Sequence, residues 1–363
     1  MNDQYTRRLS EIEAVLDKWL PEKPGSQWME MVFDFSGNIV SPELALSLTL
    51  PPRDLVNRGG KRWRPLLMVL AAECIAGDSG ARAALPLTPV VEFSHNASLI
   101  HDDIEDNSDE RRGKPAIHLV YGVDTAINSG AFLYFLPLAC VSRWEKDIGK
   151  AVSPELKEKI WTAWASHMRR LHLGQAMDIG WHRDFRSFPG LDEYDRMCRL
   201  KTGCLARLAS VLGIYSASAA LGRDIPGSFI DRFAASAEEL GVGFQILDDV
   251  KNLTAGIPGK KPGDDIVEGK KSLPVLLYLH RYPEKRDFIA SCFAAARIAG
   301  TDSPESAAMV NALESSGVLE EAREKAFLYI RKCKTSFSDM EIPGFPLNDE
   351  ACRLLPGLID LIS

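Results

Sequence analysis

Helical periodicity along almost the whole chain is the feature that most limits its possible folds. Apolar residues recur at helical spacing, whereas the alternation of apolar and polar residues that marks strands is scarce. The predicted helices cover residues 66–76, 90–104, 126–144, 154–177, 193–220, 230–253, 272–279 and 303–334. Ser153 followed by Pro154 is a typical helix start. The sequence therefore predicts an all-α protein.

The composition favours one large folded body. The chain has 363 residues, of which 45% are hydrophobic, and this is ample for a large buried core. No long stretch rich in Pro, Gly or Ser divides it, and no internal repeat is evident. We therefore expect a single domain over residues 1–363, with the functional motifs in a core of residues 55–280.

Charge, cysteine usage and hydropathy exclude several classes of function. The net charge of −7 argues against general nucleic-acid binding, although four basic clusters, at residues 61–64, 111–112, 260–261 and 270–271, suit a small anion. The seven cysteines are scattered without a CxxC pair, which favours inert thiols in a reducing compartment and a cytoplasmic protein. The longest apolar run, residues 131–141, is too short to span a bilayer, so we expect no membrane span.

Acidic residues gather where the predicted helix 90–104 ends. Asp106 follows Asp102 by four residues and Asp103 by three, so all three carboxylates share one helix face. They would repel one another, and the C-terminal end of a helix dipole disfavours negative charge. A hard cation such as Mg²⁺, which prefers to share its remaining sites with phosphate, would offset both effects. Taken alone, such a cluster is more often a solvated helix end.

A second apolar helix, 243–252, ends in the same way. It carries Asp248 and Asp249, and Asn252 follows Asp248 by four residues. Two such helices facing each other would direct oxygens into a shared space, as in the metal sites of helix bundles. Lysines and arginines bind diphosphate oxygens through charge-assisted hydrogen bonds. Two acidic faces and four basic clusters therefore predict a magnesium–diphosphate site.

The motifs between Gly59 and Pro274 occur in an order that resembles the trans-isoprenyl diphosphate synthases, most closely the eukaryotic-type geranylgeranyl diphosphate synthases. The matching residues are 59–65 (GGKRWRP), 102–108 (DDIEDNS), 111–113 with Pro115 and His118, 174–178 (GQAMD), 201–203 (KTG), 244–252 and 263–270. The resemblance implies the all-α isoprenoid synthase fold, a large antiparallel helical bundle around a central cavity. It also implies a homodimer.

The resemblance also implies a role for each matching residue. Two Mg²⁺ ions would be held by Asp102, Asp103 and Asp106, and a third by Asp248. Isopentenyl diphosphate would be bound by Lys61, Arg64, His95 and Arg112, and the allylic diphosphate by Arg111, Lys201, Lys270 and one of Lys260 or Lys261. The reacting end of the chain would be faced by oxygens of Thr202 and Gln245. Asn252, counted with the substrate-binding residues, replaces an aspartate found in many members, and this puts tight binding of the third ion in doubt.

The expected activity is the magnesium-dependent head-to-tail (1′–4) condensation of isopentenyl diphosphate with an allylic prenyl diphosphate. Ala97 and Ser94 lie five and eight positions before Asp102, where bulky residues in this family resemble stoppers of the product tunnel. Both are small here, which favours a twenty-carbon product, geranylgeranyl diphosphate. Phe93, or Phe132 or Tyr134 from another helix, could close the tunnel deeper.

Two alternatives remain open at this stage. A class I terpene cyclase would share the fold and the first acidic motif, but it would not need Lys61, Arg64, His95 and Arg112. A non-catalytic regulatory subunit of a heteromeric prenyl synthase would usually lack aspartates of the first motif, which this chain keeps.

Overall fold

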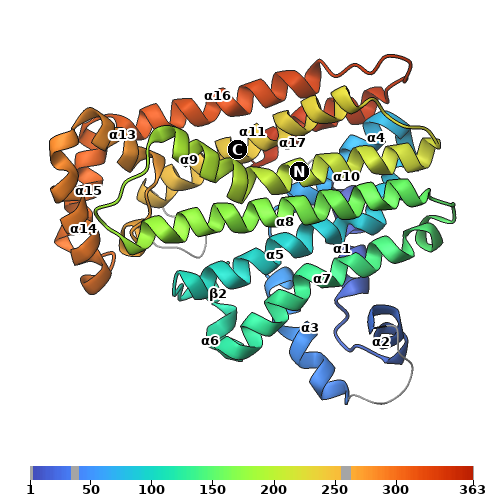
Figure 1. Ribbon diagram of the computed structural model, residues 1–363, viewed down its shortest axis with the longest axis horizontal. Coiled ribbons are helices and arrows are strands. Elements are labelled where there is room, and N and C mark those ends of the chain that lie inside the picture. Colours follow the sequence, from blue (N-terminus) through green and yellow to red (C-terminus); the bar gives the residue numbers. More distant parts are fainter. Residues whose placement is uncertain (1–2, 34–40, 255–262, 363) are drawn as a thin grey trace. The chain divides into compact units, whose positions relative to one another are not determined.

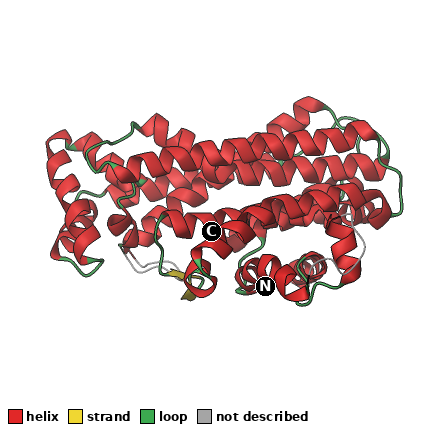
Figure 2. Cartoon of the chain, turned by 60° about the horizontal axis from the view of Figure 1, so that its bottom comes forward, coloured by secondary structure: helices red, strands yellow, loops and turns green. Residues whose placement is uncertain are grey.

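The computed structural model describes residues 3–33, 41–254 and 263–362, and these residues are helical almost throughout (Figures 1 and 2). The strands described are β1 (Glu110–Arg111) and β2 (Lys114–Pro115), which pair as a short antiparallel hairpin. The all-α prediction is confirmed.

The contacts within the chain divide it into two compact units. The first unit comprises Met1–Ser166, Arg207–Ala234 and Ser336–Ser363, and the second comprises His167–Ala206 and Ala235–Thr335. The expectation of a single domain over residues 1–363 stays a prediction.

The first unit is built around α5 (Thr88–Glu105), which packs along α7 (Val123–Ile148) and beside α4 (Trp63–Ala84) (Figure 1). The other elements that contribute to it are α1 (Asp3–Trp19), α2 (Ser26–Phe33), α3 (Pro42–Asn57), η1 (Leu85–Leu87), α6 (Ile117–Tyr121), α17 (Asp349–Ile362), and parts of α8 (Pro154–Arg183), α10 (Cys204–Leu221), α11 (Gly227–Thr254) and α16 (Val318–Ser338). Nearly every residue of α5 from Thr88 to Ala97 is buried, so this helix is the core element of the unit.

The second unit contains the remaining parts of α8, α10, α11 and α16. Its own elements are α9 (Leu191–Cys198), the π-helical turn η2 (Arg199–Gly203), α12 (Asp264–Glu268), α13 (Leu273–Arg281), η3 (Pro283–Lys285), α14 (Arg286–Ala299) and α15 (Pro304–Ser315). The π turn lies directly between α9 and α10, within the segment that the sequence predicted as one helix over 193–220. Single π turns inside helices are frequent at functional sites.

Local signals fixed most of the helix ends. The Ser153 hydroxyl accepts a hydrogen bond from the Leu156 N–H at 3.2 Å, which confirms the predicted start of α8. The prediction of one helix over 303–334 is wrong, because the chain breaks between α15 and α16 at Gly317, whose φ is +77°. That left-handed conformation ends a helix at little cost only in glycine.

Among the described residues, the helical stretch Leu191–Leu221 is long and apolar enough to cross a membrane, and Val123–Phe135 with Leu138–Ile148, bent by 40°, would be a second if the pair were counted as one span. However, 78% of the most apolar window of Leu191–Leu221 is buried inside the protein, as in a core helix.

Candidate active site

The acidic end of α5 is closed by an arginine from the hairpin. Asp103 is fully buried, and Arg111 on β1 donates its Nε–H to Asp103 Oδ1 at 2.8 Å. A terminal nitrogen of the same guanidinium bonds to Asp103 and lies 3.5 Å from Asp102 Oδ2. The repulsion expected between these neighbouring carboxylates is therefore offset by one shared cation.

The hairpin holds Arg111 in place through its own backbone. Its two central residues, Arg112 and Gly113, have φ values of 55° and 73°, as in a type I′ turn. Arg58 at the end of α3 donates hydrogen bonds to the Arg111 carbonyl at 3.1 Å and to the Pro115 carbonyl at 2.8 Å. The hairpin is thus fastened to α3, and it presents two consecutive arginines.

Arg112 is directed into the interior of the first unit. Its guanidinium donates to the Leu55 carbonyl at 2.9 Å and to Asn96 Oδ1 at 3.2 Å. Burial lowers its pKa to about 10, although the Glu92 carboxylate opposes that shift. Gly60 leaves space for it, because a Cβ there would lie 3.1 Å from the Arg112 Nη2 atom.

Arg64 and His95 form the next part of the cationic cluster. Arg64 Nη1 lies 3.3 Å from His95 Nε2, and the Arg64 guanidinium stacks 4.5 Å above the Trp63 ring. Burial, and then the charges of Arg64 and Arg112, hold the pKa of His95 well below its usual value. The imidazole is therefore neutral at pH 7 and can accept a hydrogen bond from Arg64. Lys61 lies close in sequence to Arg64 and is exposed.

The sequence reasoning missed the network that supports these cations. Arg62 donates to Glu92 Oε1 at 2.9 Å and to Glu13 Oε1 at 2.7 Å. Asn96 Nδ2 donates to the same Glu92 oxygen at 2.9 Å, and Asn96 Oδ1 faces Arg112. The available signal was the pair Glu92 and Asn96, two polar residues four positions apart in a buried helix.

In the second unit, Lys201 is fixed by a carboxylate on α8. Its Nζ lies 2.5 Å from Asp178 Oδ2, and His182 Nε2 lies 2.6 Å from Asp178 Oδ1. Burial alone would raise the pKa of Asp178, but the charges of Lys201 and His182 outweigh it and lower the pKa. Asp178 was not among the predicted site residues. Its motif was visible, and the spacing of four residues to His182 was the signal.

Thr202 and Gln245 form the start of a buried hydrogen-bond chain. Thr202 Oγ1 donates to Gln245 Oε1 at 2.7 Å, and Gln245 Nε2 donates to Asp249 Oδ1 at 3.0 Å. The other Asp249 oxygen accepts from the Tyr194 hydroxyl at 2.6 Å and from the Leu273 N–H at 3.1 Å. Burial raises the pKa of Asp249. Asp249 therefore orients Gln245, and both of its oxygens are occupied by hydrogen bonds.

Glycines bring the backbones of α8, the π turn and α11 into direct contact. A Cβ on Gly174 of α8 would lie 2.4 Å from the Lys201 backbone nitrogen. A Cβ on Gly241 of α11 would lie 2.6 Å from the Gly203 Cα atom. These close approaches place Lys201 and Thr202 on rigid backbone between two helices.

Asn252 supports α12 in this structure. Its side chain is fully buried, and Oδ1 accepts a hydrogen bond from the Asp265 N–H at 3.1 Å. The Asn252 carbonyl accepts from the Gly263 N–H at 2.8 Å. Gly263 occupies the N-cap position of α12 and has no side chain, so Asn252 supplies the capping oxygen from another helix. Its assignment to substrate binding stays a prediction.

Lys270 follows α12 and is held by two carboxylates. Its Nζ lies 2.5 Å from Glu268 Oε2 and 3.7 Å from Asp265 Oδ1. Its backbone N–H donates to the Asp265 carbonyl at 2.8 Å, so its position depends on α12. Lys260 and Lys261 lie outside the described residues.

The oxygen donors suit a hard divalent cation. Asp102, Asp103 and Asp106 lie at the end of α5, and Asp248 is exposed on α11. Among residues 3–33, 41–254 and 263–362, no three His, Cys, Asp or Glu side chains gather as a ready-made metal site. Mg²⁺ is usually bound through one or two carboxylates together with substrate phosphates and water.

Comparison with known proteins identifies the family. The sequence model of the family described as polyprenyl synthetase matches residues 47–309. The chain belongs to the polyprenyl synthetase family. The resemblance seen in the sequence, and with it the isoprenoid synthase fold, is therefore confirmed.

Individual members of the polyprenyl synthetase family agree with this assignment. The geranylgeranyl diphosphate synthase of Methanosarcina mazei is 32% identical over 280 residues, covering 76% of this chain and 74% of that protein. The crystal structure of a geranylgeranyl pyrophosphate synthetase from Pyrococcus horikoshii Ot3 superposes with a TM-score of 0.78 at 25% identity, covering 99% of this chain and 97% of the other.

A polyprenyl synthase from Caulobacter crescentus CB15 shares the fold, with a TM-score of 0.73 at 24% identity and coverage of 99% and 97% of the two chains. That protein was crystallised with calcium and isoprenyl diphosphate. Polyprenyl synthetases are divalent-metal-dependent prenyl synthases, and the carboxylates at the ends of α5 and α11 have the donor chemistry for such an ion.

Proposed function

We propose that this polyprenyl synthetase condenses isopentenyl diphosphate head-to-tail (1′–4) with an allylic prenyl diphosphate and releases geranylgeranyl diphosphate. The observation that carries the proposal is that one helix, α5, holds both kinds of group that the reaction needs. Its last turn carries Asp102 and Asp103 beside Arg111, and two turns earlier it carries His95 beside Arg64. Metal-binding carboxylates and an arginine cluster for a diphosphate therefore lie in the same unit.

Magnesium fits the donor set, and we assign three ions to it. Asp102, Asp103 and Asp106 would hold two of them, and Asp248 the third. When bound, the ions would neutralise negative charge on the leaving diphosphate. Arg111 now neutralises Asp103, and it would be available to the allylic diphosphate once cations occupy the carboxylates.

The protein groups act mainly by binding and by electrostatic stabilisation. Lys61, Arg64, Arg112 and neutral His95 would hold isopentenyl diphosphate. Because His95 is uncharged, it accepts a hydrogen bond from Arg64 and orients that guanidinium without adding positive charge.

Lys201, Lys270 and Arg111 would hold the allylic diphosphate. The carbon–oxygen bond of that substrate breaks, the double bond of isopentenyl diphosphate attacks the allylic cation, and a proton leaves to the released diphosphate. The Thr202 hydroxyl donates its hydrogen to Gln245, so its lone pairs remain to face the developing positive charge. No covalent nucleophile is required.

The twenty-carbon product follows from the small side chains on α5. Ala97 and Ser94 are both fully buried, so a larger side chain at either position would take up interior volume of the first unit. Phe93 is fully buried as well, and Phe132 stacks on Phe33 at a centroid distance of 5.8 Å. We assign any deeper closure of the tunnel to Phe93 on α5, or to Phe132 or Tyr134 on α7.

The test is incubation of the purified protein with Mg²⁺, labelled isopentenyl diphosphate and each allylic primer in turn, followed by sizing of the dephosphorylated products. We expect elongation that ends at twenty carbons. Products of fifteen carbons would retain the reaction and refute the role of Ala97 and Ser94. Absence of incorporation with every primer would refute the proposal and favour a regulatory subunit.

An Asp103→Ala variant tests the carboxylate assignment separately. We expect its turnover to fall by about 10²-fold or more, by analogy with other preorganised electrostatic groups. Near-normal turnover would refute the assignment. We also expect a homodimer, which light scattering coupled to size-exclusion chromatography would test.

A further inference from the structure

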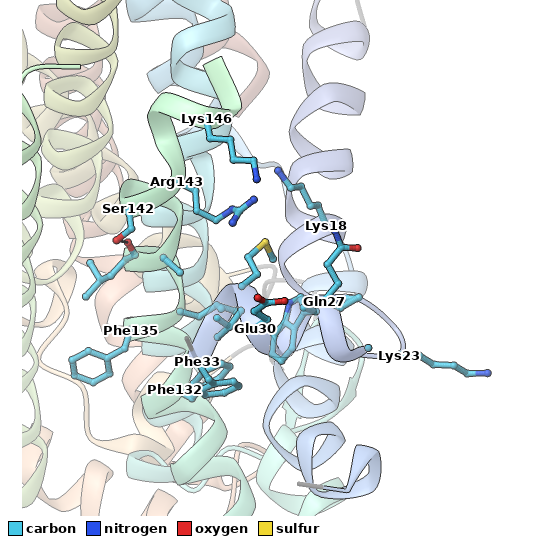
Figure 3. Close-up of a pocket in the computed structure, with 18 of the residues that line it drawn as sticks. Lys18, Lys23, Gln27, Glu30, Phe33, Phe132, Phe135, Ser142, Arg143 and Lys146 are labelled. Atoms are coloured by element: carbon cyan, nitrogen blue, oxygen red, sulfur yellow. Dashed lines mark hydrogen bonds between the residues drawn. The ribbon is translucent and has the colours of Figure 1, made fainter. Parts of the chain in front are cut away.

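A large pocket in the first unit shares no residue with the proposed metal and diphosphate sites. It has a volume of about 1170 Å³ and lies between α2 and α7, with further wall residues from α1 and α8 (Figure 3). This volume is slightly above the range of small-molecule pockets, roughly 300–1,000 Å³. No step of the proposed reaction uses it.

One end of the pocket is aromatic. Trp28 meets Phe33 edge-on at a centroid distance of 5.9 Å, and Phe33 stacks on Phe132 at 5.8 Å. Phe135 also lines the pocket, and 61% of its surface is exposed. Figure 3 shows Phe33 and Phe132 side by side at this end, whereas Phe135 projects from the other side of α7. There it meets Trp164 edge-on at a centroid distance of 6.1 Å. Trp28, Phe33 and Phe132 therefore form the aromatic wall at this end of the pocket.

The other end is cationic. Lys18, Arg143 and Lys146 project into the same region at the end opposite the phenylalanines (Figure 3). Lys18 is paired with Asp147 at 3.0 Å. The Arg143 Nε–H is buried and has no hydrogen-bond partner among the described residues. A buried donor without a partner costs free energy, and an anion bound at this end would satisfy it.

We propose that this pocket binds an amphiphile with one apolar chain and an anionic head group, such as a carboxylate or a phosphate. The chain would lie against Trp28, Phe33 and Phe132, and the head group would accept hydrogen bonds from Arg143 and Lys146. The separation of aromatic and cationic groups to opposite ends matches the two ends of such a molecule. Asp147 neutralises Lys18, and Glu30, the acidic residue of the lining, lies near Gln27 on α2. Arg143 and Lys146 therefore remain for the head group.

Binding to the intact protein is measured by isothermal titration calorimetry without Mg²⁺ or isopentenyl diphosphate, so that the result does not depend on catalysis. The probes are palmitate and farnesyl monophosphate. Each has one apolar chain and an anionic head group, but the chain is acyl in palmitate and prenyl in farnesyl monophosphate. Dodecyltrimethylammonium and inorganic phosphate are the controls for charge sign and for the head group alone. We expect both anionic amphiphiles to bind and both controls to bind at least about tenfold more weakly. The tighter of the two anionic probes indicates whether the natural chain is acyl or prenyl.

Variants locate the site. Arg143→Gln should weaken binding of the anionic amphiphiles about tenfold, because it removes a charge-assisted hydrogen bond. Lys285→Gln is the matched control, since it makes the same change in charge at an exposed residue outside the pocket and should leave affinity unchanged. Circular dichroism checks that both variants fold.

Three results would overturn the proposal. The first is equal binding of the cationic and anionic amphiphiles. The second is an Arg143→Gln affinity equal to that of Lys285→Gln, which would move the binding to another site such as the active site. The third is absence of binding by every probe together with a Phe135→Asp variant that dissociates a dimer, which would show that a second copy of the chain covers this face.

Discussion

Replacement of Asn252 distinguishes a structural role from a metal-binding role for the residue that departs from the family pattern. Asn252→Ala removes the oxygen that accepts the Asp265 N–H and leaves that buried donor without a partner. Loss of such a bond, or of a helix cap, costs about 1–2 kcal/mol. The loss falls on α12, a helix of only five residues, and so it should loosen Lys270, whose N–H is bonded to the Asp265 carbonyl.

The kinetic consequence should appear in the allylic substrate. A loss of about 1.4 kcal/mol in the placement of Lys270 corresponds to a tenfold higher KM for the allylic diphosphate. The KM for isopentenyl diphosphate should stay constant. Steady-state kinetics with each diphosphate varied in turn, and thermal unfolding of the same samples, measure both effects. The exposed residue Asn311 provides the control, because Asn311→Ala should change neither quantity.

Asn252→Asp separates the two roles. An aspartate keeps the accepting oxygen and adds a negative charge that favours a helix N-terminus, so α12 should stay in place. If Asn252 were a metal ligand, the two variants would change the Mg²⁺ concentration needed for half-maximal rate. Asn252→Asp would lower that concentration, because it adds a negative charge, and Asn252→Ala would raise it. We expect that concentration to be unchanged in both variants. A shift of several-fold with an unaltered unfolding temperature would refute the capping role.

Three further predictions concern the second unit. Gly174→Ala should destabilise the protein by about 1–3 kcal/mol and abolish most activity, because its Cβ would lie 2.4 Å from a backbone nitrogen of the π turn. The control is Gly180→Ala on the same helix, where the Cβ has open space and the change should be neutral in the same unfolding and activity assays. Burial lowers the pKa of Lys271 from 10.5 to about 8. Between these two pH values the Lys271 side chain is protonated in the unfolded chain and deprotonated in the folded protein. Stability should therefore rise between pH 8 and pH 10.5, and denaturant titrations should show that Lys271→Met removes the rise. Thr202→Val deprives Gln245 of its donor and should lower kcat about tenfold while the KM for isopentenyl diphosphate stays constant; an unchanged kcat would exclude Thr202 from the chemistry.

Sequence reasoning succeeded where the signal was local. The helix 90–104 is α5 almost to the residue, since an apolar run, a proline at its start and acids at its end are all contained in one segment. The hairpin strands β1 and β2 were not predicted, because each is only two residues long.

The remaining details depend on contacts between distant residues. The partnership of Lys201 with Asp178 joins residues 23 positions apart and requires α8 to lie beside the π turn. The role of Asn252 could not be seen, because its partner Asp265 lies 13 residues further along the chain and its N–H carries no sequence signature. The false continuation of the helix over 303–334 came from weighting apolar spacing above the single break at Gly317.

The contact between Gly203 and Gly241 has a consequence for protein engineering. The two backbones touch at this point, with a Cβ on Gly241 only 2.6 Å from the Gly203 Cα atom, so neither position tolerates a side chain. Ala97 and Ser94, in contrast, carry fully buried side chains on α5. Libraries that test the proposed control of product length should therefore vary Ala97 and Ser94 and hold this glycine pair constant, because a side chain at either glycine would force two backbones apart.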